Sequence, residues 1–364
     1  MVVVGGGQAG LAAAHELERR GVTFVVLEAA DRVGDQWRKR WDSLRLFTPA
    51  RFDALPGSEF PAPPASFPAK DQVADYLEAY SRKGGLPVRT GVRALKLERG
   101  EASYRLETSA GTVEADHVVI ATGYSKPRIP QFAVQLNPDI KQLHAADYRN
   151  PSQLRADVLV VGAGTSGVEV AIEAAGAGHR TVLAGRATGS IPPFVYGFDG
   201  AIFWFYANRL TSLKTPIGRR MRPLVRSHGA PLVRIKMSDA TAAGVELAPR
   251  VASVENGLPT LVGGRRIEPG TIVWCTGFHR DYSWIKFPVA GPDGYPRQRD
   301  GVAEDETGLY FVGLPFQTRL ASALICGVAE DARLVADAIE TRLRQARESR
   351  SPVGPAADPV HAGR

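Results

Sequence analysis

Apolar and polar residues come in blocks at the start of the chain, and the block lengths predict a β-α-β unit. The apolar run Val2–Val4 is followed by glycines and then by Leu11–Arg20, where apolar positions recur with helical spacing. A second apolar run, Thr23–Leu27, ends at Glu28. Because parallel strands need a crossover connection, a strand, a helix and a strand in this order indicate a parallel sheet.

The same succession of blocks returns in the second half of the chain. Val158–Val161 precedes glycines, a helix-like stretch and the short run Thr181–Leu183. Each half also contains an apolar strand that ends in a turn of threonine, glycine and an aromatic residue, once at 116–124 and once at 270–278. This repetition predicts that the two halves are related by internal duplication.

The remaining periodic segments predict a small antiparallel sheet and a C-terminal strand and helix. Asp71–Lys83 has the spacing of an amphipathic helix. Gly308–Leu314 is expected to be a strand, and a helix is expected from Ala321 to about Arg344. The antiparallel strands are expected at Val92–Leu97, Tyr104–Thr108 and Thr112–Val113.

The glycines after the two apolar strands form the same G-x-G-x-x-G pattern twice. Such a turn lets the backbone approach a pyrophosphate at a helix N-terminus. One fingerprint is a weak signal, but two in one chain predict two dinucleotides and hydride transfer between them. The first copy is Gly5, Gly7 and Gly10, with Gln8 and Ala9 between them, and the second is Gly162, Gly164 and Gly167 with Thr165 and Ser166.

The residue that follows the second strand differs between the copies, and this difference assigns the ligands. Glu28 lies where a carboxylate binds ribose hydroxyls, so the first site suits FAD or NAD. Gly185 holds the equivalent place in the second copy, and Arg186 follows it. An arginine there suits the 2′-phosphate of NADPH, although Arg186 could also be a solvated surface residue.

These patterns predict an α/β fold with two nested Rossmann-type dinucleotide-binding domains. The FAD domain is expected at 1–150 and 280–345, and the inserted NADPH domain at 151–279. Residues 346–364, rich in proline and polar residues, are expected to form a disordered tail.

Composition limits the other function classes. Cys275 and Cys326 are the only cysteines and form no C-x-x-C pair, which favours a reducing cytoplasm and argues against a redox dithiol. The histidines show no metal-ligand spacing. The net charge of +7 is accompanied by no recognised nucleic-acid module, and no apolar run is long enough to span a membrane. The segment Ile191–Arg226 contains the aromatic run Phe203–Tyr206 and then a basic run, and it is expected to be a packed helix with a solvated end. A substrate wall and a membrane-surface patch are the alternatives for this segment, and Phe203–Tyr206 is the expected contact of a homodimer.

Several further motifs resemble those of the flavin-containing monooxygenases in the broad sense, including the CzcO-like bacterial flavoproteins and the plant YUCCA-type enzymes. The resemblance extends from Val2 to Ile339. His144 and Tyr148 match the second half of the identifying motif F-x-G-x-x-x-H-x-x-x-Y, whereas Pro138 and Ile140 replace its phenylalanine and glycine. The other matching segments are Gly34–Trp37, Trp41–Leu46, Phe67–Lys70, the turn at 121–124 and the segment 308–314.

The resemblance implies an NADPH- and O2-dependent FAD monooxygenase that oxygenates a small organic substrate through a C4a-(hydro)peroxyflavin. Thr48 stands in the stretch where animal members carry an asparagine near the flavin, which makes it the candidate catalytic side chain. Two alternatives remain: an NAD(P)H:acceptor oxidoreductase without oxygen transfer, favoured by the altered motif, and a non-catalytic flavin redox sensor.

The resemblance also implies which residues bind the two cofactors. Trp37 would stack on the flavin or fill a core gap, and Arg45 would contact the cofactor or form a surface salt bridge. Thr165 and Ser166 would bind phosphate or cap a helix. The expected FAD residues beyond the first fingerprint and Glu28 are Gln36, Trp37, Arg45, Val92, Ala121, Thr122, Gly123, Ser322 at the start of the last helix, and Leu324; the expected NADPH residues beyond the second fingerprint are Arg186, Thr276 and Gly277.

Overall fold

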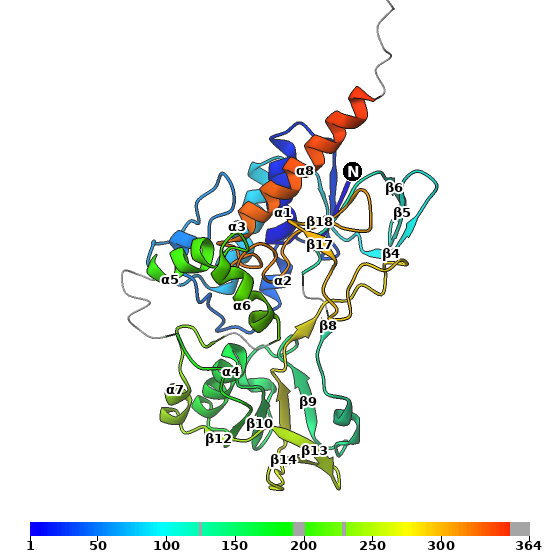
Figure 1. Ribbon diagram of the computed structural model, residues 1–364. Coiled ribbons are helices and arrows are strands. Elements are labelled where there is room, and N and C mark those ends of the chain that lie inside the picture. The colour runs from blue at the N-terminus through cyan, green and yellow to red at the C-terminus, as the bar shows by residue number, and fades with distance from the viewer. Residues whose placement is uncertain (124–125, 192–200, 228–230, 350–364) are drawn as a thin grey trace, which may run out of the picture.

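The protein is a mixed α/β chain with two parallel sheets, each the centre of its own body. The computed structural model describes residues 1–123, 126–191, 201–227 and 231–349. Figure 1 shows an upper body, which holds the N-terminus and the long last helix, and a lower body built from the middle of the chain.

The upper body is organised around a seven-stranded sheet whose central strands are short and fully buried. Successive side chains of a strand point to opposite faces, so Val3 packs with the helices on one face while Val2 and Val4 pack on the other. In sheet order the strands are β17 (Gln298–Arg299), β18 (Val302–Ala303), β19 (Leu309–Phe311), β7 (Val118–Ile120), β1 (Val2–Val4), β2 (Val25–Leu27) and β3 (Val88–Arg89). The five strands from β19 to β3 are parallel.

The lower body has a five-stranded sheet in which every neighbouring pair is parallel. Val160 faces the helical side, and Leu159 and Val161 face the opposite side. In sheet order the strands are β12 (Glu246–Ala248), β11 (Thr181–Ala184), β10 (Val158–Val161), β15 (Thr271–Trp274) and β9 (Lys141–His144). The strand β9 therefore belongs to the second sheet, although the expected domain boundary at residue 150 would assign it to the first domain.

Smaller sheets complete the two bodies and join them. The predicted antiparallel excursion is confirmed as a three-stranded sheet of β4 (Ala94–Arg99), β5 (Tyr104–Thr108) and β6 (Gly111–Ala115). A hairpin of β13 (Val251–Glu255) and β14 (Leu258–Leu261) extends from the lower body. An antiparallel pair, β8 (Lys126–Pro127) with β16 (Phe278–His279), lies between the bodies where the chain crosses from one to the other.

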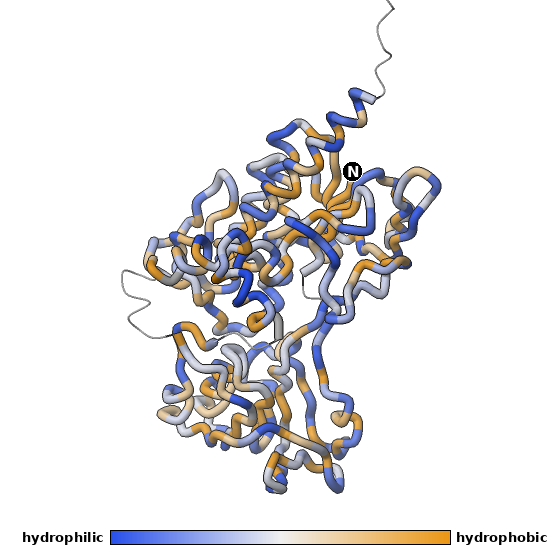
Figure 2. Tube along the Cα trace, viewed as in Figure 1, coloured by the Kyte–Doolittle hydropathy of each residue, from blue (hydrophilic) through white to orange (hydrophobic). Residues whose placement is uncertain are grey.

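The helices cover the sheets. They are α1 (Gln8–Glu18), α2 (Asp35–Arg38), α3 (Lys70–Lys83), α4 (Thr165–Gly176), α5 (Ala201–Phe205), α6 (Pro216–Ser227), α7 (Met237–Ala242) and α8 (Val328–Glu348). Short 3-10 segments occur at η1 (Ala50–Phe52), η2 (Gln131–Gln135) and η3 (Pro151–Gln153), and η6 (Tyr206–Leu210) is a π-helical turn. Figure 2 shows the hydrophobic segments concentrated along the strands inside both bodies.

The last helix differs from the prediction at both ends. It begins at Val328 after Gly327, so Ser322 lies in the preceding turns and not at a helix N-terminus. It continues to Glu348, so residues 346–348 are helical and not part of a disordered tail. The rest of the predicted tail, from 350 onward, lies outside the described residues.

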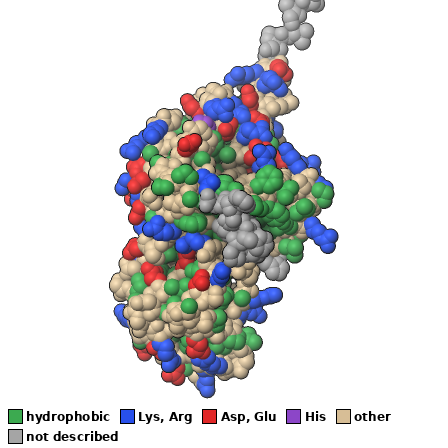
Figure 3. All heavy atoms as spheres, turned by 90° about the vertical axis from the view of Figure 1, so that its left-hand side faces the viewer, with side chains coloured by type: hydrophobic (Ala, Val, Ile, Leu, Met, Phe, Trp, Pro, Cys, Tyr) green, Lys and Arg blue, Asp and Glu red, His purple; other side chains and the backbone are tan. Residues whose placement is uncertain are grey.

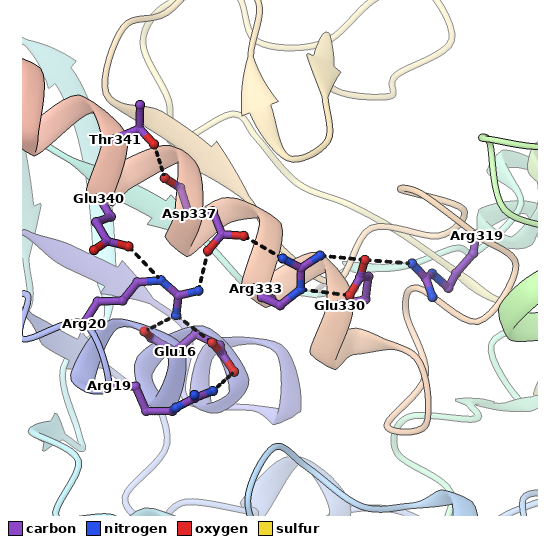
Figure 4. Close-up of polar contacts among 9 residues, drawn as sticks. All are labelled: Glu16, Arg19, Arg20, Arg319, Glu330, Arg333, Asp337, Glu340 and Thr341. Carbon is purple, nitrogen blue, oxygen red and sulfur yellow. Dashed lines mark hydrogen bonds and ion pairs between the residues drawn. The ribbon is translucent and has the colours of Figure 1, made fainter.

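Ion pairs fasten α8 to α1, the helix that follows the first glycine turn (Figure 4). Arg20 lies 2.6 Å from a Glu16 carboxylate oxygen and also pairs with Asp337 of α8. Arg333 pairs with Glu330 at 2.9 Å and with Asp337 at 2.7 Å. Because the Arg20 side chain is only 14 % exposed, these contacts are better shielded than ordinary surface pairs. They tie the C-terminal end of α1 to α8.

Candidate functional site

The first glycine turn is shaped by close backbone packing at two of its glycines and by open space at the third. Gly5 has a φ of 108°, and a Cβ there would overlap the Ala121 carbonyl. A Cβ at Gly10 would overlap the Gly5 carbonyl oxygen, because the helix packs directly on the strand end. At Gly7 an added Cβ would meet nothing within 4 Å, so this position leaves room for a ligand.

The second glycine turn repeats this geometry. Gly162 has a φ of 114°, a Cβ at Gly167 would overlap the Gly162 carbonyl, and Gly164 again has open space within 4 Å. The backbone contacts are also equivalent, since the amides of Ala121 and Cys275 each donate at 2.8 Å to the residue that ends the neighbouring strand. The two glycine turns therefore have equivalent backbone contacts.

Both turns lead into helices whose first amides are open to a ligand. The helices α1 and α4 have glycine N-caps, no side-chain cap and no acidic residue in the first turn. Uncapped N–H groups and the positive end of the helix dipole attract phosphate. Thr165 and Ser166 therefore do not cap α4, which leaves phosphate binding as the role expected for them.

A cavity of about 630 Å³ lies along the carboxyl ends of four strands of the upper sheet. It passes Gly313 after β19, Ala121 after β7, Gly5 after β1 and Glu28 after β2. Ligands bind at this edge of open parallel sheets. The predicted residues that line it are Gly5, Gly7, Gln8, Ala9, Glu28, Gln36, Trp37, Val92, Ala121, Thr122 and Gly123.

Glu28 is oriented by the backbone around it. One carboxylate oxygen accepts from the Gly6 amide at 2.7 Å and the other accepts from the Ala30 amide at 2.8 Å. A Cβ at Gly6 would lie 2.9 Å from the Glu28 Cβ, so the close approach requires glycine. Each oxygen keeps a further lone pair, which is what a ribose hydroxyl needs.

The equivalent place in the lower body holds no carboxylate. A Cβ at Gly185 would lie 2.6 Å from the Ala163 amide nitrogen, so no side chain fits there. Arg186, the next residue, is exposed. At the turn after β15, the Thr276 hydroxyl donates to the Arg128 carbonyl, and the Gly277 carbonyl accepts from the Arg128 amide at 2.9 Å.

Some predicted residues do not line the cavity. Gly10 packs against the Gly5 carbonyl on the side of the turn that faces the strand. Arg45 is exposed, and its guanidinium donates to the Phe67 carbonyl at 3.2 Å. Ser322 is fully buried, and its hydroxyl accepts from the amides of Thr318 and Arg319. Leu324 packs in an apolar cluster with Trp204, although its neighbour Ala323 lines the cavity.

Two carboxyls, those of Asp53 and Asp331, are buried outside the lining of this cavity, and neither is among the predicted cofactor-binding or catalytic residues. Asp53 is 1 % exposed, and its burial raises its pKa to about 7, which the Thr48 hydroxyl beside it offsets only in part. Burial likewise raises the pKa of Asp331 to about 7, although the Thr318 hydroxyl donates to it.

The cavity also holds cations that sequence reasoning missed. Arg40 lines it, and its guanidinium lies 5.3 Å from the ring centre of Phe278 in the turn after β15. Burial lowers the pKa of Arg40, and Arg149 lowers it further. A cation in such surroundings favours an anionic ligand. The sequence feature that could have indicated Arg40 is its position three residues after Trp37, a predicted cofactor residue. The other lining residues that were not predicted include Lys126, Asp281, Trp284, Gly313 and Ala323.

The cysteines form no redox pair. Both are free thiols, and burial raises the pKa of Cys275 to about 12. Cys275 packs against the second glycine turn, since a Cβ at Gly167 would lie 3.3 Å from its Cβ. Within the described ranges, no group of three His, Cys, Asp or Glu side chains is placed to hold a metal ion, and no helix is long and apolar enough to cross a bilayer.

The sequence of the first glycine turn and the segments after it match a known family. Residues 2–192 match the pyridine nucleotide-disulphide oxidoreductase family. The chain belongs to this family. A CzcO-like oxidoreductase of Geobacillus kaustophilus, itself described as uncharacterized, is 36 % identical over 91 % of this chain and 95 % of its own length. A probable indole-3-pyruvate monooxygenase of Arabidopsis thaliana, YUCCA9, is 27 % identical over 86 % of this chain and 83 % of its own length.

A solved structure agrees with this assignment. A flavin-containing monooxygenase from Stenotrophomonas maltophilia is 25 % identical, with a TM-score of 0.77 over 94 % of this chain and 98 % of the other. The chain is thus an FAD-dependent oxidoreductase of the flavin monooxygenase superfamily, whose cofactors are FAD and NADPH. Despite the family's description, this member has no disulfide-forming pair among its described residues.

Proposed function

We propose that the protein is an NADPH- and O2-dependent FAD monooxygenase that acts on a small organic substrate. The observation that carries the proposal is the duplicated glycine turn with different residues at the ribose position. Glu28 supports a ribose with free hydroxyls in the first site, and Gly185 with Arg186 supports a 2′-phosphate in the second. Two dinucleotide sites in one chain are what hydride transfer from NADPH to FAD requires.

The cavity of the upper body is the proposed FAD site. The open space at Gly7 accommodates the pyrophosphate, and the free amides of α1 would bind it. With the ribose at Glu28, the flavin half extends toward Gly313 and Ala323, because β19 and β2 lie on opposite sides of β1 in the sheet. Trp37 and Gln36 line the cavity wall, and Val92 lies at the Glu28 end.

The lower body is the proposed NADPH site. The space at Gly164 and the first amides of α4 suit its pyrophosphate, and Thr165, Ser166, Thr276 and Gly277 surround the same strand ends. Two nested Rossmann-type domains would result. We propose the boundary at the β8–β16 pair, and not at residue 150, because β9 pairs with β15.

Bound FAD would accept a hydride from NADPH and activate O2 for transfer of one oxygen atom to the substrate. The protein's contribution is an apolar wall beyond Ala323, which includes Phe47, Phe52 and Trp204 and would keep water from the flavin. Thr48, a buried hydroxyl beside this wall, is the proposed hydrogen-bonding side chain. The alternative, an NAD(P)H:acceptor reductase, is favoured only by Pro138 and Ile140 in the motif.

A surface of the upper body supports a homodimer as a further proposal. Two neighbours in the predicted aromatic run of residues 203–206 differ in exposure, since Trp204 is buried and Phe205 is 60 % exposed. Figure 3 shows hydrophobic side chains gathered on the face that carries α5 and α6. The exposed large apolar residues of α5, η6 and α6 are Ile202, Phe205, Leu210, Ile217 and Leu224. Sedimentation velocity over a range of concentrations tests self-association.

The function is tested by comparing NADPH with NADH in wild type and Arg186→Ala. We expect NADPH to reduce the bound flavin at a lower KM than NADH, and Arg186→Ala to raise the KM for NADPH about tenfold or more without changing that for NADH, as loss of a charge-assisted contact implies. Arg45→Ala is the matched control, because Arg45 is also an exposed arginine but does not line the cavity. Equal KM values for both nucleotides in wild type would contradict the NADPH assignment.

A further inference from the structure

One carboxyl, that of Asp53, is buried beside the apolar cluster of Trp204, which adjoins the proposed FAD site at Ala323. Asp53 follows η1, and its amide donates to the Ala50 carbonyl at 3.0 Å, which fixes the backbone. The cluster around it contains Phe52 and Cys326. Neither carboxyl oxygen is exposed or has a hydrogen-bond partner of normal geometry among the described residues. A buried carboxyl without partners is costly unless it has a function or keeps its proton.

The groups that face Asp53 come from three segments, and none of them is a cation. The Thr48 hydroxyl lies beside it, and the Tyr76 ring of α3 and the Cys326 thiol are close enough to interact electrostatically. The Tyr76 hydroxyl is already used, because it donates to the Ser58 carbonyl at 2.7 Å and accepts from the Leu55 amide at 2.7 Å. Thr48 is therefore the side chain left to hydrogen-bond with Asp53.

The charge of Asp53 decides which way the Thr48 hydroxyl points. A protonated carboxyl donates its O–H to the Thr48 oxygen, which leaves the Thr48 proton free to donate elsewhere. An ionised carboxyl only accepts, so it takes the Thr48 proton for itself. Burial favours the protonated form of Asp53 up to about pH 7, because its pKa is raised to about 7.

We propose that Asp53 is a positioning residue whose proton directs the Thr48 hydroxyl toward the flavin site. The proposal rests on the proposed function, in which Thr48 lies next to the flavin. It makes the pair a proton-controlled donor: Thr48 donates into the site while Asp53 is neutral, and ceases to do so when Asp53 ionises.

The pair is tested directly by infrared difference spectroscopy of the protein as a function of pH. Asp53 and Asp331 should both contribute to the carbonyl band of protonated carboxyls, since both have a pKa of about 7. We expect one component of this band to disappear with a midpoint near pH 7, to be missing from Asp53→Asn, and to persist in Asp331→Asn. Asp331 is the matched control because it is equally buried but bonded to Thr318. Thr48→Val should move the band to higher frequency and raise the midpoint, and Thr48→Ser should restore both.

The direction of the hydroxyl is tested in the FAD-loaded enzyme by the fraction of NADPH electrons that appear as H2O2. We expect this fraction to rise several-fold above about pH 7 in wild type and to stay constant in Asp53→Asn, because an amide keeps donating to Thr48. Thr48→Val should be uncoupled at every pH.

Three results would overturn the proposal: a carbonyl band in Asp53→Asn that is identical to that of wild type, an Asp53 component that Thr48→Val leaves unshifted, or an H2O2 fraction with the same pH profile in wild type and Asp53→Asn. If the enzyme proves to be a reductase without oxygen transfer, the infrared result still decides whether Asp53 and Thr48 form a pair. The Thr48 variants keep the test valid should Asp53→Asn fail to fold.

Discussion

The Nε2 atom of His144 lies 3.1 Å from the carbonyl oxygen of Gly277, across the boundary between the end of β9 and the turn after β15. Its Nδ1 atom accepts from the Ala146 amide at 3.1 Å, so the proton of the neutral ring is on Nε2 and is donated to Gly277. Burial lowers the pKa of His144, which keeps the ring neutral. The His144 ring is also nearly perpendicular to the Phe278 ring, with 4.9 Å between the two ring centres.

Replacing His144 should therefore loosen the turn that the proposed NADPH site uses. We expect His144→Phe to raise the KM for NADPH about tenfold and to lower the free energy of unfolding by about 1–2 kcal/mol, because a hydrogen bond is lost. FAD content should stay unchanged. His144→Gln retains a donor and serves as the control, and an unaltered KM in His144→Phe would show that the contact is dispensable.

Arg40 should hold an anionic ligand in the cavity. Arg40→Met removes the charge but keeps much of the apolar stem. We expect it to weaken FAD binding about tenfold to a hundredfold, the range for hydrogen bonds to charged groups, because Arg40 lines the cavity proposed for FAD. Titration of the FAD-free protein with FAD measures the dissociation constant. Arg45→Met is the matched control, because Arg45 is exposed and off the cavity; equal effects in both variants would rule out a specific role for Arg40.

Substitutions of two glycines in the first turn should have different effects, one on stability and the other on FAD binding. Gly10→Ala places a methyl group in the Gly5 carbonyl, and we expect it to destabilise the protein by about 1–3 kcal/mol or more. Gly7→Ala has open space, so it should fold with wild-type stability in the FAD-free form yet bind FAD at least tenfold more weakly. Urea unfolding and flavin titration measure the two quantities, and normal FAD binding by Gly7→Ala would argue against the proposed pyrophosphate position.

The raised pKa of Asp53 should appear as a pH dependence of stability. The folded state holds this proton to about pH 7, whereas the unfolded state loses it near pH 4, so stability falls as pH rises between these values. We expect wild type to lose roughly 3 kcal/mol relative to Asp53→Asn between about pH 5 and about pH 8. Urea unfolding at both pH values measures this. An equal change in the free energy of unfolding of wild type and Asp53→Asn between the two pH values would contradict the raised pKa of Asp53.

Most of the nucleotide-binding geometry could be predicted because it depends on local backbone constraints. A left-handed φ at Gly5 and Gly162 and the close packing at Gly10 and Gly167 follow from spacing alone. The position of Glu28, directly after β2, could be predicted for the same reason, since it belongs to the same β-α-β unit and its carboxylate accepts from the Gly6 amide.

The features that escaped prediction depend on packing between distant segments. Asp53 is buried by residues from the C-terminal turns, such as Cys326, as well as by its own segment. Arg40 gains its importance from Phe278 of the other body. The position of β9 depends on pairing with β15, which comes more than a hundred residues later, and the helix start at Val328 depends on how tightly Gly327 packs against Ala321.

The most direct test of the proposed monooxygenase is to reduce the FAD-loaded protein with NADPH without oxygen and then mix it with O2 while recording the flavin absorbance. For a monooxygenase, we expect NADPH to bleach the flavin and the oxidised spectrum to return only after a delay of seconds or longer. Immediate return of oxidised flavin with stoichiometric H2O2 would contradict it and favour a reductase.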